Sequence, residues 1–505
     1  MKKSSLWFSA AGALVVAAVL AGCGKTTYFA GRPLPPSGLI NRVLIAIQNP
    51  SSVTKGALQI VDGYYDIRSS YNGKTPGFSI AGFSGALPVS IQNMPEELQA
   101  AVYGSGDGSL TFINYAKENT SGTQPGLNGV SASVYVTRDR LYAFAASQTS
   151  HVFSVSDKST GTFALTLPGV YRVSVNPGGT VAMAFVQNSN YIYYARKLGT
   201  PETNAYSGGA ATWPRAAVDC EPLNAPYWCL FQAQSPDHPD PLYQGQNGLP
   251  SLFYGAPLTF DRPIKAIFSA DGGTAYVLNC GPECGGAAAS IAQLPTGPMV
   301  FQVNQQSGQL PLTGHIPTLP IPGGSSNAFI VGSTMYVVGQ CQAAGLSSGG
   351  EPQCAVPPLS TDGLFTGNLT IVDLNSNTAG NPISVSDGAP GAPSRILPAD
   401  DNTLWIGMTK CTDGERYARG LPYGCLTMFN TSTNTVTMLE PYKGDLTGIA
   451  DVEGLHKIYV AEGGQVHIYH TTSGDELNNQ YVSVTGTAYD VAYMDAKSDK
   501  SNTVY

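Results

Sequence analysis

The sequence predicts an all-β fold in which four-stranded sheets repeat around a ring, a single β-propeller. Three observations predict it: charged residues are scarce, turn-forming residues are abundant, and a strand-and-turn phrase recurs along the chain. Asp, Glu, Lys and Arg make up 12% of the 505 residues, and there are 58 Gly and 36 Pro. Average domains carry about 25% charged residues, and long helices need such residues on their solvent faces. The 42% of hydrophobic residues excludes a disordered chain.

The clearest repeat is an alternating strand that ends in a polar turn, as in residues 152–161, and this pattern is typical of a hairpin. A strand of β-branched and aromatic residues precedes it, and before that comes a third strand that runs into a tight turn, as in 171–179 and 265–273. The phrase of 152–161 returns at 300–308, 369–377, 426–434 and 466–474. Units of four strands at intervals of roughly 45–60 residues predict the blades of a propeller.

The spacing of the innermost strands predicts eight blades, or seven if residues 86–127 do not form a complete one. These strands are expected near residues 86, 131, 170, 263, 326, 391, 446 and 487. The last strand, 487–493, leaves no room for three more, so its partners are expected at the N-terminus. The expected partners are residues 42–47, 57–61 and 65–68. Pairing both chain ends in one blade closes the ring and leaves no open sheet edge.

Several phrases resemble the YVTN or YncE-like family of bacterial β-propellers. They are Phe268–Val277, Ile371–Asn375 and Thr487–Tyr493, and the resemblance covers most of residues 130–495. It implies a propeller, often with seven blades, and in many members no established enzymatic activity. The Trp-bearing repeat of quinoprotein propellers is missing, because the chain beyond residue 22 has only three Trp residues and they are not periodic. No cofactor is therefore expected.

The N-terminus carries a targeting segment. Lys2 and Lys3 precede an apolar stretch, Leu6–Leu20, that is short for a membrane span. It ends in Leu-Ala-Gly-Cys23, which resembles the lipobox of bacterial lipoproteins. The resemblance implies cleavage before Cys23, diacylation of its sulfur and acylation of the new amine; the alternative is a plain secretory signal. Gly24, where some lipoproteins have Asp, favours export to the outer membrane.

These features divide the chain into a signal peptide (1–22), a lipidated Cys23 with a flexible tether (23–41), a propeller (42–497) and a C-terminal tail (498–505). Without the signal peptide the chain has 24 basic and 34 acidic residues, a net charge of −10. This charge excludes nucleic acid as a partner, because phosphates need Lys and Arg. Membrane attachment then depends on the acyl chains, and the expected partners are an envelope protein or a glycan.

Eight cysteines remain besides Cys23, and an exported chain is oxidised. Their proximity in the sequence predicts the disulfides Cys220–Cys229, Cys280–Cys284, Cys341–Cys354 and Cys411–Cys425. The alternative is a metal site, but no CxxC spacing is present and no metal is expected. The last three pairs fall in loops after the second strand of successive blades. Such loops share one face with the loops after the fourth strand, so one disulfide-stiffened face is expected to carry recognition. The alternative is that the bridges only protect long loops.

The segment 200–261 is the longest insertion, and its part 232–261, which precedes the next innermost strand, is expected to join the same face. Its aromatic residues are candidates for stacking on a ligand or anchoring a partner, or they form a small core of the insertion itself. The candidate binding residues are Trp213, Tyr227, Trp228, Tyr243 and Tyr254.

The sequence contains no nucleophile elbow, no His-Glu-x-x-His and no phosphate loop. No catalytic residues are therefore assigned, and the sequence predicts a non-enzymatic binding or scaffold protein of the cell envelope. The alternative is a metal-dependent, lactonase-like hydrolase with its site in the central channel. That enzyme would need convergent carboxylates, for which Asp219, Glu221 and Glu283 are the candidates.

Overall fold

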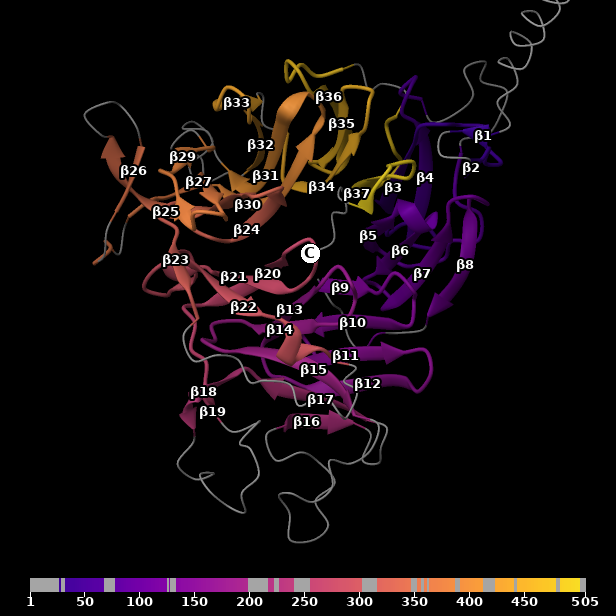
Figure 1. The fold of residues 1–505 in the computed structure, drawn as a ribbon. Coiled ribbons are helices and arrows are strands. Elements are labelled where there is room, and N and C mark those ends of the chain that lie inside the picture. The colour runs from indigo at the N-terminus through magenta and orange to yellow at the C-terminus, as the bar shows by residue number, and fades with distance from the viewer. Residues whose placement is uncertain are drawn as a thin grey trace, which may run out of the picture.

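A computed structural model shows a ring of eight antiparallel sheets (Figure 1). It describes residues 27–28, 32–67, 78–124, 127, 133–198, 217–221, 227–239, 255–301, 316–346, 352–355, 358–360, 363–386, 391–411, 423–439, 443–477 and 482–499. Across these ranges the regular elements are strands and four short 3-10 helices. Cys23 and the signal peptide lie outside the described residues.

The blades are numbered here from the first complete sheet, and the strands of each are given from the channel outward. Blade 1 is β5 (Pro88–Met94), β6 (Gln99–Gly104), β7 (Ser109–Asn114) and β8 (Asn119–Gln124). Blade 2 is β9 (Ser133–Val136), β10 (Tyr142–Ser147), β11 (Val152–Asp157) and β12 (Gly161–Thr166). Blade 3 is β13 (Val170–Val175), β14 (Ala182–Val186), β15 (Ile192–Leu198), β17 (Tyr227–Gln232) and β16 (Ala217–Glu221). Blade 4 is β20 (Pro263–Phe268), β21 (Thr274–Asn279), β22 (Ser290–Pro295) and β23 (Thr318–Pro320).

The second half of the ring has the same plan. Blade 5 is β24 (Asn327–Val331), β25 (Thr334–Leu346), β27 (Phe365–Asp373) and the short β28 (Thr378–Ala379) and β29 (Ile383–Ser384), with β26 (Pro352–Cys354) on the end of β25. Blade 6 is β30 (Ala392–Ala399), β31 (Thr403–Cys411), β32 (Tyr423–Asn430) and β33 (Thr435–Leu439). Blade 7 is β34 (Leu446–Val452), β35 (Lys457–Glu462) and β36 (Gln465–His470), edged by Glu476. Blade 8 is β37 (Thr487–Tyr493), β3 (Arg42–Gln48) and β4 (Gly56–Asp62), edged by Ser79.

The predicted ring closure is confirmed. Strand β37 pairs antiparallel with β3, with Val43 opposite Tyr493 and Ile45 opposite Val491. The predicted outer strand 65–68 is wrong, because Tyr65 and Asp66 lie in a tight turn in which the Asp66 N–H donates to the Asp62 carbonyl (2.8 Å). Residues 78–80 take that edge instead: the Ile60 N–H donates to Phe78 (3.0 Å) and the Ile80 N–H to Leu58 (3.2 Å).

Part of the long insertion belongs to a blade. Strand β17 pairs with β15, with Ala195 opposite Leu230, and β16 pairs with the outer edge of β17. The sequence predicts one long insertion over 200–261; the structure places the strands β16 and β17 of this segment in the sheet of blade 3. Burial of Trp228 and Leu230 against blade 2 provides the apolar contact that holds these strands in the sheet. The smaller strands β1 (Thr27–Tyr28) with β2 (Arg32–Pro33), and β18 (Gln234–Pro239) with β19 (Gly255–Pro257), pair outside the blades.

The core lies between the faces of neighbouring blades, where apolar side chains form a series of clusters around the ring. The cluster between blades 7 and 8 joins Ile45 and Val491 to Tyr459 and Ile468. Each blade therefore buries both of its faces only when the ring is complete.

Polar side chains of the innermost strands link seven of the eight pairs of neighbouring blades. The links, from the blade 8–1 junction onward, are Ile91 N–H to Asp490 Oδ2 (2.8 Å), Val136 N–H to Gln92 Oε1 (2.6 Å), Val173 N–H to Ser133 Oγ (3.0 Å), Ala266 N–H to Ser174 Oγ (3.1 Å), Lys265 Nζ to Asn327 Oδ1 (2.8 Å), Asn327 Nδ2 to Ser394 O (3.1 Å) and Arg395 Nε to Thr447 O (2.8 Å). At the eighth junction Gly448 packs directly on Asp490: a Cβ there would lie 2.6 Å from the Asp490 Cα. We call this set of contacts the inner belt.

A buried ion pair fastens the two ends of the ring. The Arg42 guanidinium donates two hydrogen bonds to Asp495, Nη2 to Oδ1 (2.6 Å) and Nε to Oδ2 (3.0 Å). Its Nη1 donates to the Tyr115 carbonyl (2.6 Å) and to Glu118 (3.0 Å) in blade 1. Arg42 is 1% exposed. The residues before it also pack on the ring, since Ser37 donates to Glu118 through its N–H (2.7 Å) and hydroxyl (2.5 Å). The expected tether of 23–41 therefore has a docked end.

Arg42→Met should lower the free energy of unfolding by about 3–5 kcal/mol, because it leaves the Asp495 and Glu118 carboxylates buried without their cation. Urea denaturation of the purified protein measures this loss. Arg138→Met is the control: the Arg138 side chain is 43% exposed and pairs with Glu96 (3.6 Å) and with Asp499 (2.9 Å). Solvent screens the pairs of a half-exposed guanidinium, so the loss should be clearly smaller than in Arg42→Met, and equal losses in the two variants would contradict the role assigned to Arg42.

Candidate functional site

The two faces of the ring differ in what they carry. Loops after the second and fourth strands of each blade form one face, which we call the loop face. Loops after the first and third strands form the other, the termini face, where Arg42 meets Asp495. The predicted disulfides Cys280–Cys284 and Cys341–Cys354 are present and lie on the loop face. Strand β26, which carries Cys354, projects from the edge of the ring in Figure 1.

The other two predicted pairs lie elsewhere or are described in part. Cys220–Cys229 is present and joins β16 to β17 within blade 3. Cys425 is disulfide-bonded, and the side chain of its expected partner, Cys411, lies outside the described residues. The three described bridges indicate an oxidising, extracytoplasmic compartment. Among the described residues, no helix has the length and apolar character needed to cross a bilayer.

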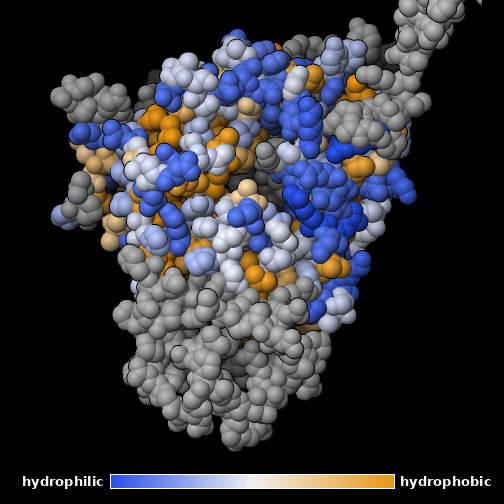
Figure 2. All heavy atoms as spheres, in the orientation of Figure 1, coloured by the Kyte–Doolittle hydropathy of each residue, from blue (hydrophilic) through white to orange (hydrophobic). Residues whose placement is uncertain are grey.

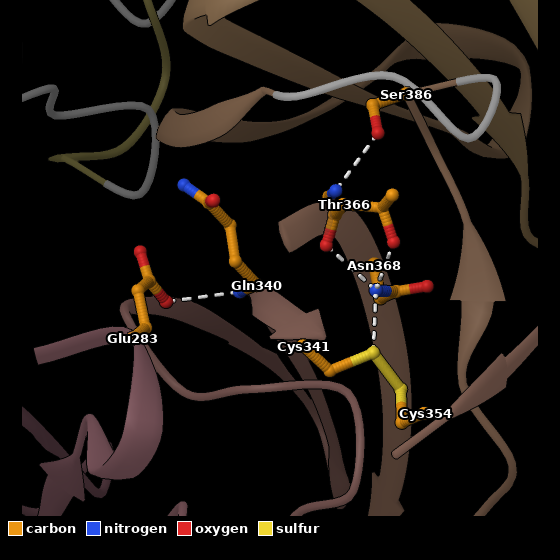
Figure 3. Close-up of a disulfide and its surroundings, with 8 residues drawn as sticks. Glu283, Gln340, Cys341, Cys354, Thr366, Asn368 and Ser386 are labelled. Carbon is orange, nitrogen blue, oxygen red and sulfur yellow. Dashed lines mark hydrogen bonds between the residues drawn. A yellow bond between two sulfur atoms is a disulfide. The ribbon is translucent and has the colours of Figure 1, made fainter. Parts of the chain in front are cut away.

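Two of the clamped loops meet across the junction of blades 4 and 5. Glu283 lies in the 3-10 helix η2 (Gly281–Cys284), between the cysteines of one bridge. The backbone N–H of Gln340, next to Cys341, donates to Glu283 Oε2 (2.9 Å). Figure 3 shows the Glu283 and Gln340 side chains side by side. Gly324 and Gly339 let the segment before β24 pack closely on β25 beside Gln340, because a Cβ at Gly324 would lie 2.4 Å from the Gln340 N and a Cβ at Gly339 would lie 2.3 Å from the Gly324 carbonyl carbon.

Strand β27 holds the Cys341–Cys354 disulfide in place. The Asn368 amide donates to the Cys341 sulfur (3.1 Å) and to the Thr366 carbonyl (2.8 Å), and the Gly367 N–H donates to the Ser386 hydroxyl (2.8 Å) (Figure 3). These contacts hold the backbone of Gln340 in place, and Gln340 in turn positions the Glu283 carboxyl.

Charged side chains gather at one level of the innermost strands. In six blades the register of the innermost strand shifts by one residue near its loop-face end, and such bulges redirect side chains. The residues directly after the bulge occupy equivalent positions and are Ser90, Arg172, Lys265, Arg395, Gly448 and Asp490. Three cations and one carboxyl group therefore share one level of the ring.

The environment changes the charge states of several of these groups. Burial lowers the pKa of Lys265 well below its usual range, and the nearby Arg172 and Arg395 lower it further. Burial raises the pKa of Glu283 to about 7, although the Gln340 N–H and Arg172 act in the opposite direction. Burial likewise raises the pKa of Asp490 to about 6 against the effect of Arg395. Glu283 can therefore exchange a proton near neutral pH.

The structure corrects one candidate binding residue. Trp228 is 0% exposed and donates from Nε1 to Asp157 (3.2 Å). Its ring contacts Tyr142, Phe144 and Phe301 at centroid distances of 5.2–5.8 Å. Trp228 therefore forms the core between blades 2 and 3 and offers no stacking surface. Tyr227 begins β17, but its side chain lies outside the described residues, as do Trp213, Tyr243 and Tyr254.

The three candidate carboxylates of a hydrolase do not converge. Asp219 and Glu221 lie on β16, the outermost strand of blade 3, where Asp219 accepts the Thr166 N–H (2.6 Å). In the described part of the chain, one group of three His, Cys, Asp or Glu residues has ligand atoms within 4.8 Å of one another: Glu96, Glu97 and Asp499 on the termini face. Arg138 pairs with two of them.

Sequence reasoning missed the charged positions of the channel, although a signal was present. When the phrases 171–179 and 265–273 are aligned from their first residues, Tyr171 corresponds to Lys265. Gly179 (φ 63°) and Gly272 (φ 70°) are the two turn glycines with left-handed backbone. Aligning these two glycines instead shifts the register by one residue and places Arg172 on Lys265, as the structure does.

No family model matches this chain, and no curated protein matches it. Similar solved structures include the dihydro-heme d1 dehydrogenase NirN in complex with DHE, at 10% identity over 92% of this chain and 79% of that one (TM-score 0.46). They include apo AztD from Citrobacter koseri, at 12% over 90% and 97% (TM-score 0.43). They also include the periplasmic gluconolactonase PpgL of Pseudomonas aeruginosa, at 13% over 90% and 98% (TM-score 0.38). The strand pairing itself defines the chain as a β-propeller, and the YVTN-like assignment stays a resemblance.

Glu283→Gln should change how stability depends on pH. The folded protein keeps the Glu283 proton up to about pH 7, whereas the unfolded chain releases it near the ordinary pKa of 4.5, so the wild type loses stability as the pH rises between these values. The variant escapes this loss and should gain about 1–2 kcal/mol relative to wild type across that window, less than a fully buried group would because the side chain is partly exposed.

Urea denaturation at a series of pH values measures the difference, and a constant difference between pH 4.5 and 7 would refute the raised pKa. Asp271→Asn is a useful contrast. The Ser269 hydroxyl lowers the pKa of Asp271, so Asp271→Asn should be slightly less stable than the wild type by a constant amount in neutral solution, and the difference should shrink only in more acidic solution.

Proposed function

We propose that this protein is a non-enzymatic binding or scaffold protein of the cell envelope that recognises a protein or glycan partner through its loop face. The observation that carries the proposal is the joined pair of disulfide-clamped loops in blades 4 and 5, linked by the Gln340–Glu283 hydrogen bond. Loops held in this way lose less conformational entropy when they bind. Binding residues in many folds sit on loops that a rigid scaffold positions.

The path of the N-terminal segment supports an anchored arrangement. Arg32 donates to the Pro95 carbonyl (2.8 Å) and Ser37 to Glu118, so residues 32–41 run along the termini face. An acyl anchor at Cys23 would hold that face towards the bilayer and leave the loop face directed away from it. The outer membrane is the proposed site of attachment, because Gly24 follows Cys23.

A second candidate function is the lactonase-like hydrolase. A specific observation favours it: Glu283 is a partly exposed carboxyl with a pKa of about 7, which suits a general acid or base. Glu283→Gln separates the two functions, because a hydrolase would lose its turnover of a lactone and a binding protein has none to lose.

Cys23→Ser should release the protein from the membrane fraction, because anchoring depends on the acyl chains and the net charge disfavours adhesion to anionic lipid. Metabolic labelling with an alkyne analogue of palmitate, followed by cell fractionation, measures both incorporation and release. A Cys23→Ser protein that still carries label or still sediments with membranes would refute lipidation at this residue.

A photo-crosslinking residue on the loop face should capture the partner in intact cells. Ala344 is exposed at the loop-face end of β25, beside Cys341, and Thr160 is an exposed control position in the turn between β11 and β12 on the termini face. We expect a discrete conjugate from position 344 and none of the same mass from position 160. Conjugates of equal yield at both positions, or none at either, would contradict recognition by the loop face.

A further inference from the structure

We propose that the channel binds a small oxyanion, a carboxylate or phosphate group of a soluble ligand, through the guanidinium of Arg172 near the loop-face mouth. The inference concerns a site inside the ring and does not depend on the protein or glycan partner proposed for the outer loops. The argument rests on the hydrogen bonding of Arg172, on the side to which it is exposed, and on the charges around it.

Arg172 differs from the two cations at its level. Lys265 donates to Asn327 Oδ1 (2.8 Å), and Arg395 donates to the Thr447 carbonyl through Nε (2.8 Å) and Nη2 (2.5 Å). The Arg172 guanidinium makes no hydrogen bond or ion pair with any residue that the structure describes, and it rests on the ring of Tyr171 at 5.6 Å. None of its five N–H donors is therefore used by the part of the chain that the structure describes.

The exposed part of Arg172 faces the channel. The residue is partly exposed and lies on β13, the innermost strand of blade 3. Both faces of that blade are covered, one by blade 2 and the other by blade 4. Arg172 is the third residue of a strand that starts at the loop face, which places it near that mouth. Figure 2 shows hydrophilic residues gathered on the right of the ring, over the strands of blade 1.

The surrounding charges favour an anion at this position. Arg172 and Arg395 each lie near enough to Lys265 to lower its pKa, so an anion beside Arg172 would offset the positive charge that gathers at this level of the channel. Two carboxyl groups are nearby. Asp490 already accepts the N–H groups of Ile91 (2.8 Å) and Val491 (2.9 Å). Glu283 accepts one from Gln340 and holds a proton below about pH 7.

The geometry of a guanidinium defines the class of ligand. Its planar pair of N–H groups matches the two oxygens of a carboxylate or phosphate, and it can form two parallel hydrogen bonds. The Glu283 carboxyl and the Gln340 amide, on the adjoining blades, supply polar groups for the remainder of a small ligand. The site therefore suits a hydroxylated or amide-bearing organic acid, or a phosphate ester, better than an apolar molecule.

Isothermal titration of the purified mature protein with inorganic phosphate and, separately, with malonate tests the proposal, with glycerol as a neutral probe. The wild type should bind at least one of the two anions saturably at concentrations up to about 10 mM, which corresponds to weak millimolar affinity, and should not bind glycerol. Binding of phosphate alone would assign a phosphate ester, and binding of malonate alone would assign an organic acid.

Arg172→Gln should reduce the affinity about tenfold or more, and Arg172→Lys, which keeps the charge but loses the paired donors, should reduce it less. Arg138→Gln on the termini face is the matched control and should bind like the wild type. Thermal unfolding by circular dichroism verifies that each variant is folded, and Arg172→Lys serves if Arg172→Gln is not. Unchanged affinity in a folded Arg172 variant, or no saturable binding of either anion, would overturn the proposal.

Discussion

The buried contact of Arg42 with Asp495 joins the first strand of the ring to the residues that follow its last strand. A blade cannot bury both faces unless each neighbour is in place, so an open ring would expose apolar surface at two blades at once. The guanidinium accounts for the closure geometrically: one edge binds Asp495 with two hydrogen bonds and the other reaches the turn between β7 and β8 of blade 1. Three segments that are far apart in the sequence thus meet at one side chain.

The inner belt extends this constraint around the channel. Each of its seven hydrogen-bonded links joins a side chain of one innermost strand to a backbone or side-chain atom of the next, and Gly448 replaces the link at the remaining junction. The same positions hold the charges of the channel, because the bulged register places Arg172, Lys265, Arg395 and Asp490 at one level. The residues at this level therefore serve both the ring and the candidate ligand site. Of the four charged residues there, Arg172 is the one that takes no part in the inner belt.

Much of the fold could be predicted because hairpins are local. Alternating strands and polar turns predict each blade from within about 50 residues of sequence, and the leftover strand 487–493 predicts the closure. The disulfides between near neighbours follow for the same reason. The outer strand of blade 8 was mispredicted because Tyr65 and Asp66 have strand-like neighbours, and only the turn at Gly63–Asp66 reverses the chain. The burial of Trp228 depends on contacts between blades, which no local pattern shows, whereas the level that Arg172 shares with Lys265 follows from the sequence only when the turn glycines are aligned.

Hydrogen exchange of the intact protein, followed by mass spectrometry, tests the closed ring most directly. If β3 and β37 form one sheet fastened by Arg42, their backbone amides exchange only when the whole ring opens. Peptides covering 42–48 and 487–493 should then be protected as strongly as those covering β13 or β30 in the middle of the chain. Rapid exchange in either terminal strand, with the middle blades still protected, would show that the ring opens at this junction and would contradict the account.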